Sequence, residues 1–122
     1  MAHRDTAIRC AILTEAGELI GMVSLLAIDR LNQSAQLHIL ISPESARGQG
    51  AGSFAIKEML RHAFLDMNLR RVELEVLEDN LQARHVYEKA GFVLEGLKRE
   101  AVYKNGGFVN LCLYSMLRSD FT

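Results

Sequence analysis

The stretch ARGQGAG, residues 46–52, decides how the chain is interpreted, because it joins a strand-like segment to a helix-like one. Upstream, AQLHILIS (35–42) has the apolar character of a strand, and Pro43, the only proline, is expected to end it. Downstream, SFAIKEMLRHAFLDM (53–67) carries apolar residues at helical spacing, at Ile56, Leu60, Ala63, Phe64 and Met67. The sequence therefore predicts a strand, a glycine loop and an amphipathic helix in succession.

The glycine loop alone leaves two interpretations open. It lacks the spacing of the dinucleotide fingerprint and of the P-loop. It nevertheless lies where a helix begins, and the unpaired N–H groups and the dipole of a first helical turn favour an anion. Glycines let a phosphate approach the backbone, and Arg47 adds a charged donor. A phosphate seat and a loose surface turn are both compatible with these residues.

The rest of the chain fits one domain over residues 1–122. DNLQARHVYEKAGF (79–92) predicts a second helix, with Asp79 or Asn80 as N-cap and Gly91 past its C-terminus. Its inward stripe is expected to be Ala83, Val86, Tyr87 and Ala90. Strands are expected at 7–14, 19–29, 70–78, 97–104 and 108–117, with the last two joined by the turn NGG at 105–107. The predicted fold class is α/β: a mixed, mostly antiparallel twisted sheet with two main helices.

Composition excludes several classes of protein. The net charge is −1, which argues against non-specific nucleic-acid binding. No apolar run approaches the length of about 20 residues that spans a membrane, and the first ten residues lack the apolar core of a signal peptide. We therefore expect a cytoplasmic protein without a nucleic-acid or membrane partner. Cys10 and Cys112 are expected to be buried free thiols, and no residues have a spacing that predicts a metal site.

Two ordered motifs resemble a known family. Arg47, Gly50 and Gly52 fit R/Q-x-x-G-x-G/A, and about thirty residues later the chain fits N-x-x-A-x-x-x-Y-x-x-x-G-F at Asn80, Ala83, Tyr87, Gly91 and Phe92. Together they resemble the GNAT superfamily of acetyl-CoA-dependent N-acetyltransferases, over about residues 8–118. Among the branches of this superfamily, the sequence most resembles the spermidine and ribosomal-protein N-acetyltransferases.

The resemblance implies an acetyl-CoA site. In the family the glycine-loop amides bind the pyrophosphate, and the pantetheine pairs with the edge of the preceding strand, here His38 to Ile41. A backbone N–H of that strand would polarise the thioester carbonyl. The residues expected to bind acetyl-CoA are Ile39, Leu40, Ile41, Arg47, Gly48, Gln49, Gly50, Ala51, Gly52, Asn80, Ala83 and Tyr87.

The resemblance also implies catalytic roles. Tyr87 matches the family tyrosine that protonates the departing thiolate, although its place in the apolar stripe would also suit a packing residue. Relatives often carry a glutamate as general base where this chain has Gln36, and an amide cannot accept the proton. His38 is two residues on and faces the same side of the strand, so it is a candidate base, and a plain surface or core histidine is the alternative. Glu73 and Glu75, acting through water, are further candidates, or simply the solvated face of a strand.

The implied reaction moves acetyl to a primary amine, either a polyamine or a peptide N-terminus. The family usually has a strand and two helices before the first hairpin, and they form much of the acceptor wall; this sequence opens on the hairpin. A second protomer would supply that wall, so we expect a homodimer or a larger homo-oligomer. The alternatives are a fragment, or a non-catalytic acyl-CoA-binding or assembly module. A nucleotide-phosphate binder that uses only the glycine loop is a third possibility. Asn110 stands where relatives often carry an acidic residue, which bears on acceptor recognition.

Overall fold

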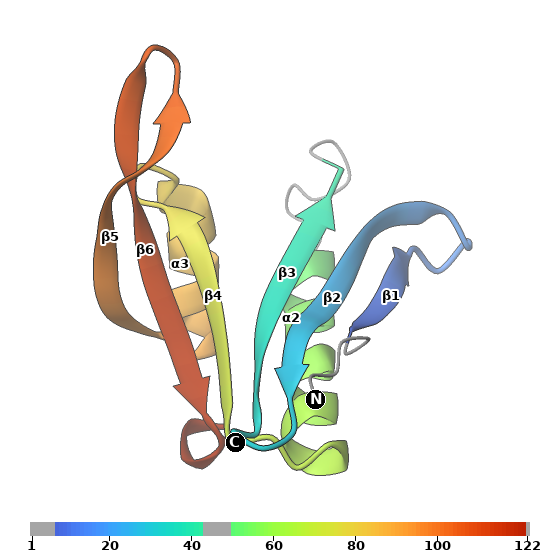
Figure 1. Cartoon of the computed structure of the whole chain (residues 1–122). Helices are drawn as coiled ribbons and strands as arrows, with labels where there is room; N and C mark the ends of the chain where they lie inside the picture. Colours follow the sequence, from blue (N-terminus) through green and yellow to red (C-terminus); the bar gives the residue numbers. More distant parts are fainter. Residues whose placement is uncertain (1–6, 43–49, 122) are drawn as a thin grey trace.

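The computed structural model describes residues 7–42 and 50–121. Within them the elements follow the expected order (Figure 1). The strands are β1 Ile8–Leu13, β2 Leu19–Asp29, β3 Ser34–Ile41, β4 Arg71–Leu77, β5 Val93–Lys104 and β6 Gly107–Leu117. The helices are α2 Ala51–Arg61 and α3 Leu81–Ala90, and short helical turns follow at His62–Asp66 and Arg118–Asp120. Mixed α/β architecture is thus confirmed.

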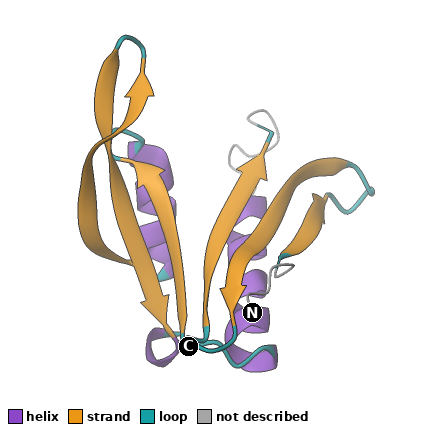
Figure 2. Ribbon diagram, in the orientation of Figure 1, coloured by secondary structure: helices purple, strands orange, loops and turns teal. Residues whose placement is uncertain are grey.

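The strands form one six-stranded sheet in the order β1-β2-β3-β4-β6-β5. Only β3 and β4 are parallel, and every other neighbouring pair is antiparallel. Both α2 and α3 lie on the same side of this sheet (Figures 1 and 2). We call the opposite side the open face, because no described helix packs on it.

The core lies between the helices and the sheet. Val72, Leu74 and Val76 of β4 point into it, as their alternation predicts. Leu25 of β2 and Tyr114 of β6 are fully buried on the same side. From the first helical segment, the buried side chains are Ala55, Ile56, Met59, Leu60, Ala63 and Phe64. The apolar stripe of the sequence is therefore the packed face of α2 and the turn after it.

Three element boundaries differ from the sequence-based expectation. The first helix begins at Ala51, so Gly52 is helical, and its last turn widens into a π-helical turn at His62–Asp66. That turn closes with the N–H of Met67 bonded to the carbonyl of His62 at 3.0 Å, five residues back. β5 begins at Val93, which pairs with Ser115, four residues earlier than expected.

The cysteines differ from each other. Cys112 is buried in the core, as expected, whereas Cys10 is exposed, so the expectation for Cys10 was wrong. Cys10 lies on β1, which pairs only with β2 at the edge of the sheet. In that strand Ile12 alone is buried, because the helices cover little of the edge. Neither cysteine is in a disulfide.

The β5–β6 hairpin turns at Asn105 and Gly106, both at positive φ, of 51° and 84°. This is the backbone that a two-residue turn between antiparallel strands needs, and Asn-Gly adopts it readily. The hairpin projects beyond the body of the sheet (Figure 1). None of the described helices is both long and apolar enough to cross a bilayer.

Candidate active site

The two parallel strands separate after a short stretch of pairing. β3 and β4 pair from Ser34 opposite Arg71 to Gln36 opposite Glu73, and no further. Beyond that point they diverge toward their C-terminal ends, leaving a V-shaped opening in the middle of the sheet (Figure 1). The edge of β3 that faces β4 over residues 37–41 therefore has no described strand partner.

A cavity of about 270 Å³ lies at this opening. Its walls come from β3, β4, α3 and β6, at Gln36, Leu37, His38, Ile39, Glu73, Leu74, Glu75, Tyr87 and Leu111. Tyr87 reaches the cavity from the helix side, whereas His38 and the two glutamates belong to the open face. The cavity therefore joins the two sides of the sheet. It brings together the predicted acid, the predicted base and both alternative bases.

Tyr87 is half-buried, and its ring packs edge-on against Phe92, with centroids 6.1 Å apart. Burial raises the pKa of its hydroxyl above the ordinary value of 10.0. No described residue hydrogen-bonds to this hydroxyl. Among the described residues, no fully buried side-chain N or O atom lacks a hydrogen-bond partner, so the Tyr87 hydroxyl is not fully buried. The hydroxyl is thus open to the cavity, as a neutral phenol with a proton to donate.

Helix α3 is fixed at both ends and along its side. Asn80 caps its start by accepting the N–H three residues on at 3.1 Å, and Gly91 ends it at a φ of 111°. Tyr114, fully buried on β6, accepts a hydrogen bond from Arg84 Nε at 3.1 Å and donates one to Glu88. These contacts fix the position of α3, and therefore of Tyr87, relative to the sheet.

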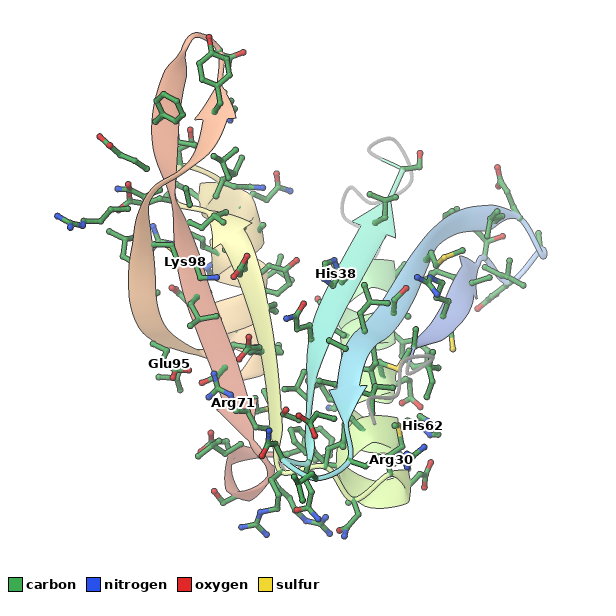
Figure 3. All side chains as sticks on the ribbon, viewed as in Figure 1. Arg30, His38, His62, Arg71, Glu95 and Lys98 are labelled. Atoms are coloured by element: carbon green, nitrogen blue, oxygen red, sulfur yellow. The ribbon has the colours of Figure 1, made fainter. Side chains whose placement is uncertain are left out.

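Gln36 and His38 lie on the same face of β3, as expected, and both side chains are exposed. Figure 3 shows His38 on the edge of β3 that borders the opening. No described side chain bonds to its imidazole. A neutral imidazole has one ring nitrogen that can accept a proton, whereas the amide of Gln36 can only orient a group. His62 instead pairs with Asp66, Nδ1 to Oδ2 at 2.9 Å, away from the cavity.

The two cavity glutamates are held in ion pairs. Arg71 contacts Glu73 at 2.7 Å and Glu95 at 3.0 Å, and Lys98 Nζ contacts Glu75. Hydrogen bonds, above all with Ser115 and then with Arg71, lower the pKa of Glu95. The hydrogen bond to Glu75 raises the pKa of Lys98. Both cavity carboxylates therefore already have a cationic partner, whereas His38 has no side-chain partner among the described residues, which favours His38 as the base.

Sequence reasoning missed three charged residues of this cluster. Arg71, Glu95 and Lys98 are not among the site residues predicted from the sequence, and Glu95 also lies before the expected start of its strand at residue 97. A signal was available: the stretch EGLKRE at 95–100 carries charges of both signs next to a strand. Arg71 is two residues from Glu73 on β4, whereas only the sheet order, with β6 between β4 and β5, brings Glu95 and Lys98 to this cluster.

The start of α2 has the character of an anion site. Gly50 precedes the helix at a φ of 71°, and no side chain of the described residues caps it. The first described backbone bond of the helix is Phe54 N–H to the carbonyl of Gly50, at 3.0 Å, so the amides of residues 51–53 have no partner within the helix. Such amides favour a phosphate group. Arg47, Gly48 and Gln49, the other predicted loop residues, and also Pro43, lie outside the described residues.

The remaining residues expected at the cofactor are spread along one path. Ile39 lines the cavity, whereas Leu40 is exposed on the open face. Ile41 and Gly52 are in close contact: a Cβ on Gly52 would lie 3.0 Å from Ile41 Cδ1. Ala83 is half-buried under the cap of Asn80. The free edge of β3 thus leads from the cavity to the start of α2.

Comparisons with known proteins agree with this geometry. A family model described as the acetyltransferase (GNAT) domain matches residues 1–93. The chain is 34% identical over 118 residues to the spermidine N(1)-acetyltransferase of Vibrio cholerae, covering 96% of this chain and 68% of the relative. It is 30% identical over 117 residues to the ribosomal-protein-serine acetyltransferase of Escherichia coli, covering 96% of this chain and 65% of that protein.

Solved structures give the same result. The chain superposes on a variant of the Vibrio cholerae spermidine N-acetyltransferase with a TM-score of 0.90 at 32% identity, covering 98% of this chain and 70% of that one. A dodecameric structure of the same enzyme matches with a TM-score of 0.88 at 32% identity, covering 94% and 67%. The chain therefore spans about two thirds of the length of these relatives.

Proposed function

The chain belongs to the GNAT acetyltransferase family, and on that premise we propose that it transfers acetyl from acetyl-CoA to a primary amine. The observation that carries this proposal is the opening between β3 and β4, where the hydroxyl of Tyr87 and the imidazole of His38 share one cavity. We place residues 1–122 in a single domain of this kind. A cytoplasmic location stays a prediction.

Donor binding would use two backbone features. The free amides at the start of α2 would receive the pyrophosphate of acetyl-CoA, together with the predicted loop residues. The unpaired edge of β3 would receive the pantetheine, whose amides can bond to it as an added strand does. This path ends at the cavity, so the thioester would lie beside Tyr87 and Ile39. The site residues proposed here are the ones predicted from the sequence.

The chemical step is direct attack in a ternary complex. The amine nitrogen forms a bond to the thioester carbon while a proton passes from the nitrogen to His38. A backbone N–H of β3 stabilises the charge that develops on the carbonyl oxygen. The C–S bond then breaks, and Tyr87 gives its proton to the sulfur. The ordinary pKa values of a phenol, about 10, and a thiol, about 8.5, are close enough for this transfer.

The acceptor is proposed to be a polyamine, with a peptide N-terminus as the second candidate. Two glutamates, Glu73 and Glu75, line the cavity, and carboxylates suit a substrate with several positive charges. One similar protein is named a spermidine acetyltransferase and another a ribosomal-protein-serine acetyltransferase, so both kinds of acceptor are included in the proposal. Asn110 bonds to Glu78 and to the N–H of Glu100, so it orders β5 near this cavity.

We also propose a homodimer or a larger homo-oligomer. Met22 and Leu40 pair across β2 and β3 on the open face and are 41% and 75% exposed. A second protomer would bury such apolar side chains, and a related enzyme forms a dodecamer. Light scattering after size-exclusion chromatography measures the mass directly. A monomer at every concentration up to that used for catalysis would contradict this part of the proposal.

The test of the function is acetyl transfer itself. The purified chain is incubated with acetyl-CoA and a panel of polyamines, amino sugars and N-terminal peptides, and release of the CoA thiol is followed together with the mass of the products. We expect turnover with at least one primary amine, most rapidly with a polyamine. Tight binding of acetyl-CoA without turnover on any amine would instead favour a non-catalytic acyl-CoA-binding module.

A further inference from the structure

The two glutamates of the cavity are neutralised in different ways. Arg71 lies between Glu73 and Glu95, and it donates to Glu73 through both Nη2 at 2.7 Å and Nε at 3.2 Å. Its side chain is 30% exposed and that of Glu73 is 28% exposed. A planar guanidinium that bridges two carboxylates and is partly shielded from water is a fixed structural group.

Lys98 and Glu75 form a looser pair. Lys98 reaches across β6 from β5, and it is the only described partner of the Glu75 carboxylate. The lysine side chain is 53% exposed and that of Glu75 is 38% exposed. A hydrated ammonium on a flexible stem, in an exposed pair, contributes little net stability and is easily displaced.

The charge of the cluster favours that displacement. Glu73, Glu75 and Glu95 carry three negative charges, and Arg71 and Lys98 carry two positive charges. One negative charge is left over at a cavity that must admit an amine. An incoming cation is therefore attracted to the cavity from a distance, and it can pair with the Glu75 carboxylate once Lys98 moves away.

We propose that Lys98 is a built-in competitor for the acceptor: its ammonium occupies Glu75, the carboxylate that would bind a second ammonium of a polycationic substrate. This rests on the proposed amine acetylation and deepens it, because it assigns selectivity for polyamines over monoamines to one exchangeable ion pair. A polyamine replaces the ammonium of Lys98 with its own, while its reacting amine lies between His38 and Tyr87. A monoamine has no such second charge.

Lys98 acts here by its charge and not as an acceptor of acetyl. Its hydrogen bond to Glu75 raises its pKa, so the nitrogen keeps its proton and has no lone pair for attack. Figure 3 shows Lys98 on the β5–β6 side of the opening and His38 on the β3 side. His38 thus lines the cavity from the β3 side, and Lys98 contacts it from the other side through Glu75.

The test compares Lys98→Met with Lys104→Met, which removes the same charge from the same strand but from a pair with Asp79, 3.5 Å apart, that does not line the cavity. Spermidine and a linear monoamine of similar length serve as acceptors. Calorimetric titration of spermidine into the CoA-bound protein adds a binding measurement that needs no turnover. Lys98→Arg checks whether the positive charge alone is what matters.

We expect Lys98→Met to lower both KM and Kd for spermidine about 3- to 10-fold and to leave the monoamine KM and kcat nearly unchanged. Lys104→Met should resemble the unmodified chain, and Lys98→Arg should leave the Kd for spermidine unchanged or raise it, because a guanidinium pairs with a carboxylate at least as firmly as an ammonium does. In a Glu75→Gln background, Lys98→Met should have no further effect, since the competed carboxylate is gone.

The outcomes separate the two proposals. An unchanged or raised Kd for spermidine in Lys98→Met overturns the competition, even if the unmodified chain acetylates amines. A lowered Kd in a chain that acetylates no amine supports the competition as a property of binding and overturns the proposed activity. Absence of spermidine binding in every variant overturns the competition and the polyamine acceptor, whereas the proposed acetyl transfer is overturned only if no amine of the panel is acetylated.

Discussion

His38 of β3 and Tyr87 of α3 line one cavity, although the first belongs to the open face of the sheet and the second to the helix that covers the other face. They meet because β3 and β4 stop pairing after Gln36 and Glu73. An intact sheet would separate the two side chains completely. The proposed mechanism, which needs an acid and a base on opposite sides of the reacting atoms, therefore depends on this break in pairing.

The role of His38 can be tested with a replacement base. His38→Gln should lower kcat about 100-fold or more, since a general base contributes a factor of about 100 to 10,000. Gln36→Glu in the same chain should restore part of the loss, because Gln36 lies on the same face of β3 and lines the same cavity. Steady-state kinetics at saturating acetyl-CoA measure both effects.

His62→Gln is the matched control, since His62 pairs with Asp66 outside the cavity. If His38→Gln had no greater effect than His62→Gln, His38 would not be the base, and the proton would pass to Glu73 or Glu75 through water or along a water chain to bulk solvent.

Burial of Tyr87 has a consequence at high pH. Its pKa is raised above 10.0, so the phenol keeps its proton up to that pH and loses it only above. A raised folded-state value means that the associated stability is complete below the unfolded value of about 10 and is lost as the pH rises through the folded value. Absorbance titration at 295 nm, with Tyr87→Phe subtracted from the unmodified chain, isolates this residue. A midpoint below 10 would contradict a buried neutral acid.

Gly21 is expected to be intolerant of any side chain. A Cβ at this position would lie 2.3 Å from the carbonyl oxygen of Leu40, and a backbone atom cannot move aside as a flexible side chain can. Gly21→Ala should therefore cost about 1–3 kcal/mol of unfolding free energy, as forced packing does. Gly96→Ala is the control, since a Cβ there meets nothing within 4 Å. Urea denaturation compares the two, and equal stabilities would refute the close approach of β2 and β3.

Much of the fold could be predicted because local patterns agreed with one another. Three local features are right to within about two residues: the apolar stripe of the helix after the glycine loop, the alternation at Val72, Leu74 and Val76, and the Asn80 cap. Exposure of Cys10 was missed because it depends on which strand forms the edge of the sheet, and a single sequence does not reveal strand order.

The candidate site likewise has one part that local sequence predicts and one part that depends on the order of the strands. Tyr87 and His38 could be named from a motif and from the strand period, and the structure places both at the cavity. The ion pair of Lys98 with Glu75 could not, because it joins β5 to β4 across β6. Contacts that depend on sheet order are set by long-range packing and have no local signature.

The account depends most on Tyr87 as the proton donor to the leaving thiolate, and the comparison of Tyr87→Phe with the unmodified chain tests it most directly. Phenylalanine keeps the ring and its contact with Phe92 but removes the proton. Turnover with spermidine and the Kd of acetyl-CoA are measured for both chains. The account predicts that kcat falls about 100-fold or more while the Kd for acetyl-CoA changes less than about 3-fold. An unchanged kcat would contradict it.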